Sequence, residues 1–273
     1  MMMVSIGTSF KVSEMWKNLR LMSWLGMLCL LLAVFIVPPA LALVLARLLH
    51  LNLSETGGLF LIGVAPGAPL LTRNIAKRGF DAQLAAVCQV CVALLTPLMI
   101  PLLVASAAKL YDRNVWIPPR DLIEQVAKKQ FLPLILGMIL TYLAPVYSNK
   151  LRPILNSVGN VVLYLFMGII LFKMRGDLSK ITPWVIVATL LLALGSMAVV
   201  PLLVRVEALR ERTLSICNAN RHVGLALLLS GQYFHSKDSL PTVACYALIA
   251  PLMMALYSKR LRPLPPDTVS AAA

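Results

Sequence analysis

The residues best suited to chemistry in this chain lie together in a segment that is otherwise apolar. Asn218, Asn220, Arg221 and His222 all fall between positions 213 and 234, which read as a membrane-spanning segment. Polar groups in hydrocarbon are costly unless they face a partner, a cavity or a substrate. Arginine offers a positive fork to a carboxylate, sulfonate or phosphate, and histidine changes charge near neutral pH. The cluster therefore predicts an anion-binding site, with proton coupling left open.

A purely structural role is the alternative for the same cluster. Basic side chains within membrane helices often bond backbone carbonyls that a helix break has freed. We favour function, because the asparagines cluster with Arg221 and His222 and because the segment has a counterpart earlier in the chain.

The composition indicates that membrane helices position these residues. Of 273 residues, 59% are apolar and 13% charged, with a net charge of +14, which is too little polar surface for a soluble globule. Lys and Arg lie in short loops and at span ends, a pattern that favours anionic lipid head groups over nucleic acid as partner.

Because about 20 residues cross a bilayer core, the stretches free of charge predict about eight spans in an all-α membrane protein. They are 21–46, 56–72, 82–108, 130–149, 153–172, 181–204, 223–236 and 239–258.

Two of these spans are interrupted, and they occupy equivalent places in two halves. The second span contains Pro66 and Gly67, and the seventh is cut by Arg221 and His222, directly before its charge-free part 223–236. A similar proline lies thirty residues after each break, Pro97 after Gly67 and Pro251 after Arg221. Interrupted segments in corresponding halves are typical of the binding site of a secondary transporter, where two broken helices cross. The residues expected there include Pro66 and Gly67.

Two further spans separate the two triplets, so the second triplet starts on the opposite side of the membrane and the repeats are inverted. The expected organisation is a cytoplasmic segment 1–20, core helices 21–108, an interfacial linker 109–129, panel helices 130–172, core helices 173–258 and a disordered tail 259–273. A slight excess of Lys and Arg places both termini in the cytoplasm and the protein in the cell membrane.

Arg73 and Asn74 follow the first break, where substrate contact and snorkelling of Arg73 to the interface are equal alternatives. No pair of carboxylates lies within the membrane segments, and there is no HExxH, GxSxG or phosphate-loop motif, so an enzyme is not expected.

Several ordered motifs resemble the bile acid:sodium symporter family. They are the run 39–51, the segment 63–67 (GVAPG), the turn 78–81 (RGFD) and Gly224-Leu225-Ala226 after the polar cluster. The resemblance spans residues 21–257 and implies a fold of ten helices in two inverted repeats, with a core domain, a panel domain and two crossed broken helices. On that plan this chain has the third to tenth helices, so a missing start is expected, and a homodimer is a second way to complete the panel.

The resemblance also implies cation ligands, and this sequence departs from them. The acidic ligand of the family falls at Cys217, the serine-asparagine pair of the first broken helix at Leu71 and Thr72, and a hydroxyl ligand at Gln89. Thr72 and Gln89 therefore join the candidate site. The alternative for Gln89 is a structural role, as a hydrogen-bonded amide in the core. Hard cations prefer several oxygens, including a carboxylate.

These observations together predict a secondary transporter that carries an organic anion by alternating access. No cofactor is expected, and the coupling ion, Na+ or H+, is left open. The alternative is a non-transporting membrane sensor or assembly subunit that retains only a ligand-binding core.

Overall fold

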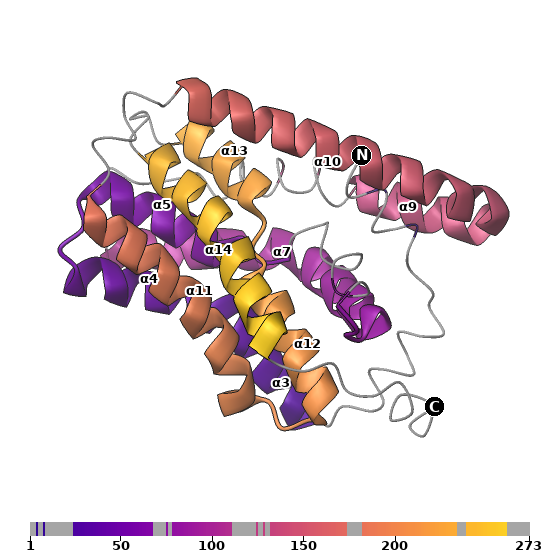
Figure 1. Ribbon diagram of the computed structural model, residues 1–273, viewed down its shortest axis with the longest axis horizontal. Coiled ribbons are helices and arrows are strands. Elements are labelled where there is room, and N and C mark those ends of the chain that lie inside the picture. Colours follow the sequence, from indigo (N-terminus) through magenta and orange to yellow (C-terminus); the bar gives the residue numbers. More distant parts are fainter. Residues whose placement is uncertain are drawn as a thin grey trace.

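The computed structural model describes residues 24–67, 75, 78–110, 132–173, 182–233 and 239–260, together with Val4, Thr8, Glu124 and Lys128. Every extended element in this part of the chain is a helix (Figure 1), so the all-α prediction is confirmed there. In order, the elements are α3 (Trp24–Leu31), the π-helical turn η1 (Leu32–Ile36), α4 (Val37–Leu48), α5 (Leu53–Val64), α7 (Ala82–Leu110), α9 (Leu132–Leu143), α10 (Pro145–Lys173), α11 (Pro183–Leu203), α12 (Ala208–Ala219), α13 (Val223–Tyr233) and α14 (Leu240–Arg260). Most of the predicted N-terminal segment, the linker 109–129 and the tail lies outside the described residues.

Four stretches of helix are long and apolar enough to cross a membrane. They are Trp24–Leu48, which joins α3, η1 and α4, then Gln83–Ser106 within α7, then α11, and then α14. α5 is apolar but shorter, with twelve residues, whereas a bilayer core needs about 20. The protein is therefore a multi-pass membrane protein in which some apolar helices stop part-way.

The boundary between the predicted fourth and fifth spans was wrong. The charged turn at Lys150 and Arg152 was expected to be a loop, but both residues lie inside α10, and the helices separate at Ala144 instead. Pro145 has no N–H and clashes with the preceding turn, so it starts a helix more readily than it continues one. Lys and Arg are good helix formers, and α10, at about 1.5 Å per residue, is longer than the roughly 30 Å hydrocarbon core.

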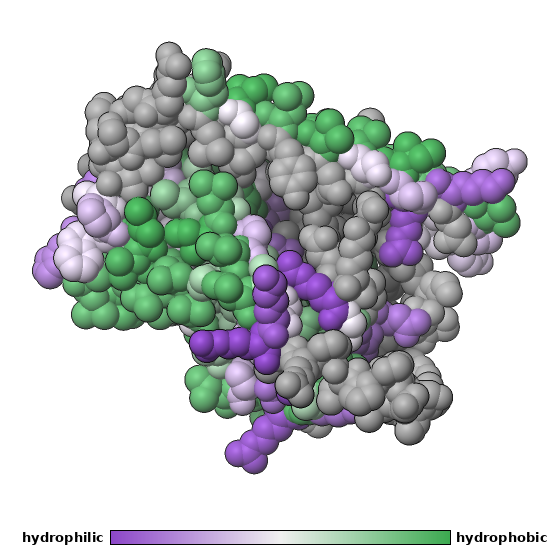
Figure 2. Space-filling model, in the orientation of Figure 1, coloured by the Kyte–Doolittle hydropathy of each residue, from purple (hydrophilic) through white to green (hydrophobic). Residues whose placement is uncertain are grey.

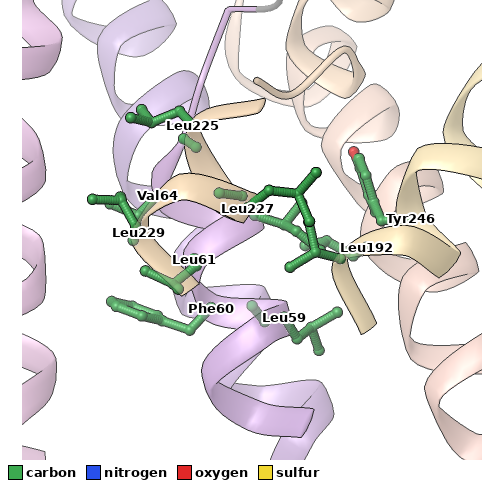
Figure 3. Packing of buried hydrophobic residues seen from close by; sticks show 14 of the residues in the cluster. Leu59, Phe60, Leu61, Val64, Leu192, Leu225, Leu227, Leu229 and Tyr246 are labelled. Atoms are coloured by element: carbon green, nitrogen blue, oxygen red, sulfur yellow. The ribbon is translucent and has the colours of Figure 1, made fainter. Parts of the chain in front are cut away.

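α11 lies at the centre of the packed helices, in contact with α4, α12 and α14. Around it the buried apolar side chains form two clusters. The first joins α4, α5 and α13 to α11 and α14, and Figure 3 shows Leu61 and Val64 of α5 beside Leu229 of α13. The second joins α3 and η1 to α7, α11 and α12. The two interrupted segments are therefore held between two apolar clusters.

The start of α5 is fixed by polar contacts that tie it to α11. Asn52 and Glu55 form a reciprocal cap, in which the Asn52 side chain accepts from the Glu55 N–H at 2.8 Å and Glu55 accepts from the Asn52 N–H at 3.1 Å. The hydroxyl of Thr182, which precedes α11, donates to Glu55 at 2.9 Å. Such caps stabilise a helix start by about 1 kcal/mol, and here Glu55 also bonds the residue that precedes α11.

Apolar side chains gather in two areas of the face shown in Figure 2. They follow the outward face of α10 along the upper edge of the view and the outer faces of α4 and α11 at the left. Val161 and Leu165 of α10, for example, are both more than half exposed. A surface of this kind suits contact with lipid acyl chains, because there is no water in the bilayer core.

Candidate functional site

The two predicted helix breaks lie against each other. α5 ends at Val64 and is followed by Ala65, while α12 ends at Ala219 and α13 starts at Val223. The backbone N–H of His222 donates to the carbonyl of Ala65 at 2.8 Å. Segments more than 150 residues apart in the chain therefore meet through a backbone hydrogen bond at their interruptions.

Local chemistry explains why α5 ends there and why α13 begins there. Pro66 has no N–H to continue α5, and Gly67 has φ +76°, a left-handed conformation that glycine adopts without strain. In the second break, the Nδ1 atom of His222 accepts from the N–H of Leu225 at 3.0 Å, as an N-cap residue does. His222 is half-buried and starts α13 in this way. Because Nδ1 accepts a hydrogen bond, the ring has its proton on Nε2.

Arg221 is fully buried at the crossing, with 1% of its surface exposed. Its Nη1 donates to the carbonyl of Val34 at 2.9 Å and, more weakly, to that of Gly63 at 3.4 Å. Its Nη2 donates to Oδ1 of Asn218 at 3.0 Å. Its Nε has no hydrogen-bond partner among the described residues. The guanidinium therefore connects η1, α5 and α12 and leaves one buried N–H unpaired there.

Asn218 extends this network to a fourth helix. Its amide nitrogen donates to the carbonyls of Ala33 at 2.9 Å and Ser196 at 2.8 Å, while its oxygen accepts from Arg221. Tyr246 of α14 donates its hydroxyl to the carbonyl of Ala219 at 2.6 Å. The end of α12 is thus bonded to α11, α14 and η1.

The carbonyls of Ala33 and Val34 need these partners because of two consecutive prolines. In a helix the carbonyl of Val34 would accept from residue 38 or 39, but both are proline and have no N–H. The N–H of Val37, which could serve Ala33, donates to Leu32 instead in the π-helical turn. A buried carbonyl without a partner costs about 1–3 kcal/mol, so Asn218 and Arg221 satisfy groups that the backbone cannot.

Helix dipoles supply the negative counterpart of the buried arginine. In the part of the chain that the structure describes, the only ion pair joins Lys128 to Glu124, so no carboxylate there pairs with Arg221. However, α5 and α12 both end at the crossing, and each helix C-terminus carries roughly half a negative charge. Arg221 bonds Gly63 in the last turn of α5 and Asn218 in the last turn of α12. The guanidinium therefore balances two helix ends.

The comparison with protein families gives one match. A family model described as Sodium Bile acid symporter family matches residues 1–181. The chain belongs to this family. A search of curated proteins found no match to the chain. Members of the sodium bile acid symporter family are transporters. The matched part of this symporter-family chain contains the first break, whereas Arg221 and its neighbours on α12 and α13 lie beyond it.

The remaining residues that the sequence predicted for the site fall into three groups: those at the two breaks, one on α7, and those outside the described residues. Pro66 is buried and Gly67 half-buried at the first break, while Asn220 is half-buried at the second. Gln89 is buried on α7. Thr72, Arg73 and Asn74 lie outside the described residues.

Sequence reasoning missed Tyr246 and the backbone carbonyls of Val34 and Gly63. A tyrosine inside an apolar helix signals a need for a hydroxyl partner, so Tyr246 could have been found. The pair Pro38-Pro39 likewise signals two carbonyls in need of donors.

Proposed function

We propose that this chain is a secondary transporter that carries an organic anion across the cell membrane by alternating access. Its eight spans would form two inverted triplets, separated by the α9–α10 hairpin, with the two broken helices crossing between them. Membership of the symporter family supports transport. The observation that carries the proposal is the hydrogen bond from His222 to Ala65, which brings the interruptions of both halves to one place.

The anion would bind beside this crossing. α13 starts there, and a helix start offers free N–H groups and a partial positive charge to an anion. Asn220 and the Nε2 atom of His222 are the side-chain donors best placed to add to it, since both residues are only half-buried. The unpaired Nε of Arg221 is a further donor, because a ligand oxygen there would remove the cost of a buried N–H without a partner. Thr72, Arg73 and Asn74 would complete the site from the first broken segment.

Uptake into proteoliposomes tests the proposal. The purified chain would be reconstituted and offered labelled bile acids, other carboxylates and sulfonates, under gradients of Na+, of H+ or of neither. We expect saturable uptake of at least one anion, and we expect it to fall at least tenfold in Asn220→Ala and His222→Ala. Arg205→Ala is the matched control, because Arg205 is exposed and away from the crossing. Full uptake by both site variants would refute the assignment of the site.

A ligand-binding protein that does not transport is the second candidate. The observation that favours it is the number of helices tied together at the crossing, since Arg221 and Asn218 hold η1, α5, α11 and α12 in one arrangement. A sensor or assembly subunit would bind an anion in detergent yet accumulate none in proteoliposomes. Saturable binding with no uptake of the same anion, under any of the three gradients, would support this candidate over the transporter.

A further inference from the structure

Three oxygen atoms from three segments converge on the guanidinium of Arg221. They are the carbonyls of Val34 in η1 and Gly63 in α5, and the amide oxygen of Asn218 in α12. All three belong to residues at the crossing of the broken helices, and Arg221 itself is 1% exposed. Convergent backbone and amide oxygens in a buried place are the ligands that hard cations such as Na+ and Ca2+ use in proteins.

The electrostatics of the crossing favour a cation. Two helix C-termini meet there, which together amount to about one negative charge, and the start of α13 offsets about half of it. In addition, two carbonyls have no backbone donor because of Pro38 and Pro39. These partial charges are buried, so water screens them little. A bound metal ion could supply the missing positive charge, but here the oxygens are already bonded to a side chain.

We propose that Arg221 is a built-in cation that occupies the place of a bound metal ion at this crossing. The residues around it do not fit Na+ in the wild-type protein, because the three oxygens are taken by the guanidinium and its positive charge would repel a second cation nearby. A permanent charge cannot dissociate, so the core would be complete without any ion from solution. If the chain is the transporter proposed above, its core would also not gain a Na+ at this position during transport.

Thermal unfolding of the purified full-length chain in detergent tests this directly. Wild type, Arg221→Ala and Arg205→Ala would be melted in chloride salts of Na+, K+ and N-methylglucamine at equal ionic strength, and again with millimolar guanidinium. The exposed Arg205 is the control for loss of an arginine as such. Guanidinium shows whether the space left by the side chain can still hold a cation, and Na+ shows whether a metal ion can take it.

We expect the wild type and Arg205→Ala to melt at the same temperature in all three salts. Arg221→Ala should melt lower in K+ and N-methylglucamine, and should recover with both guanidinium and Na+. A tenfold excess of a cation over its Kd raises Tm by about 3–6 °C for a domain of this size. If Arg221→Ala does not fold, Arg221→Gln, which keeps a donor but loses the charge, should show the same selective recovery.

Two results would overturn the proposal. One is a Na+-specific rise in the Tm of the wild type, which would mean that the arginine does not replace the ion. The other is a neutral variant, Arg221→Ala or Arg221→Gln, that folds but whose Tm does not rise with Na+. If its Tm rises with guanidinium only, the oxygens form a site for guanidinium and not for a metal ion. If its Tm rises with neither cation, the oxygens have found other partners. The measurement uses no substrate. The melting result therefore tests the role of Arg221 independently of transport. Either proposal can be refuted while the other holds.

Discussion

Replacing Gly63 by alanine tests the closest helix contact at the crossing. A Cβ atom at position 63 of α5 would lie 2.8 Å from the Cα of Pro39 and 3.0 Å from the carbonyl oxygen of Pro38. Carbon atoms in contact normally lie about 3.5–4.0 Å apart. All of the obstructing atoms are backbone atoms of α4, so α5 and α4 would have to separate by roughly 0.5–1 Å.

The size of the effect follows from a comparison with Gly168. In a helix, alanine is about 1 kcal/mol more favourable than glycine, and this gain applies to both positions. A Cβ on Gly168 in α10 meets nothing within 4 Å, so Gly168→Ala should show the gain alone. Gly63→Ala also carries the cost of overpacking, about 1–3 kcal/mol. The difference between the two variants therefore isolates the steric cost.

Thermal unfolding in detergent is the assay, with both variants melted beside the wild type. At about 2–4 °C per kcal/mol, Gly63→Ala should melt roughly 2–12 °C below Gly168→Ala. Separation of α5 from α4 would also lengthen the bond from Arg221 to Gly63, which is already 3.4 Å. If Gly63→Ala melted as high as Gly168→Ala, α5 and α4 would not be in close backbone contact, and the geometry of the crossing given above would be wrong.

Two further substitutions test the polar network. Asn218→Ala leaves the buried carbonyl of Ala33 and one N–H of Arg221 without a partner, whereas the carbonyl of Ser196 lies within α11 and keeps its helical donor. We expect a loss of about 2–6 kcal/mol, at 1–3 kcal/mol per unpaired group, seen as misfolding or a much lower Tm; wild-type stability would contradict the network. Tyr246→Phe removes one donor from the carbonyl of Ala219, which also accepts from the backbone N–H of Arg221. The free energy of unfolding should therefore fall by only about 0.5–1.5 kcal/mol. A larger fall in the same melting assay would mean that the tyrosine hydroxyl has a second role.

Much of the fold could be predicted because membrane helices are long apolar runs. The predicted limits of the third and sixth spans, 82–108 and 181–204, lie within two residues of α7 and α11. The positions of both breaks followed from residues that interrupt such runs, namely Pro66 with Gly67 and Arg221 with His222. The exception was the hairpin of α9 and α10, where a proline at position 145 outweighed a nearby pair of basic residues.

The partners of the buried arginine could not be predicted in the same way. Sequence shows that a charge within a membrane segment needs a partner, and an acidic side chain or an anionic substrate is the first expectation. The partners found are backbone carbonyls 158 and 187 positions away, and any residue type has such a group. Only the geometry of the helices decides which carbonyls lie near Arg221.

The position of the second break illustrates how a local defect in one half of the chain can require a specific side chain in the other half. Pro38 and Pro39 leave carbonyls unpaired in the first half of the chain, and a proline that bends a helix normally relies on water or on a neighbouring hydroxyl to satisfy them. Here α12 ends beside them, so its last residues lie at the distance of a hydrogen bond. A neutral donor such as Asn218 can satisfy one of these carbonyls, whereas a cation also offsets the negative charge of two helix C-termini that the start of α13 leaves unbalanced. The requirement for Arg221 therefore follows from where α5 and α12 end, and it exists whether or not a substrate is bound.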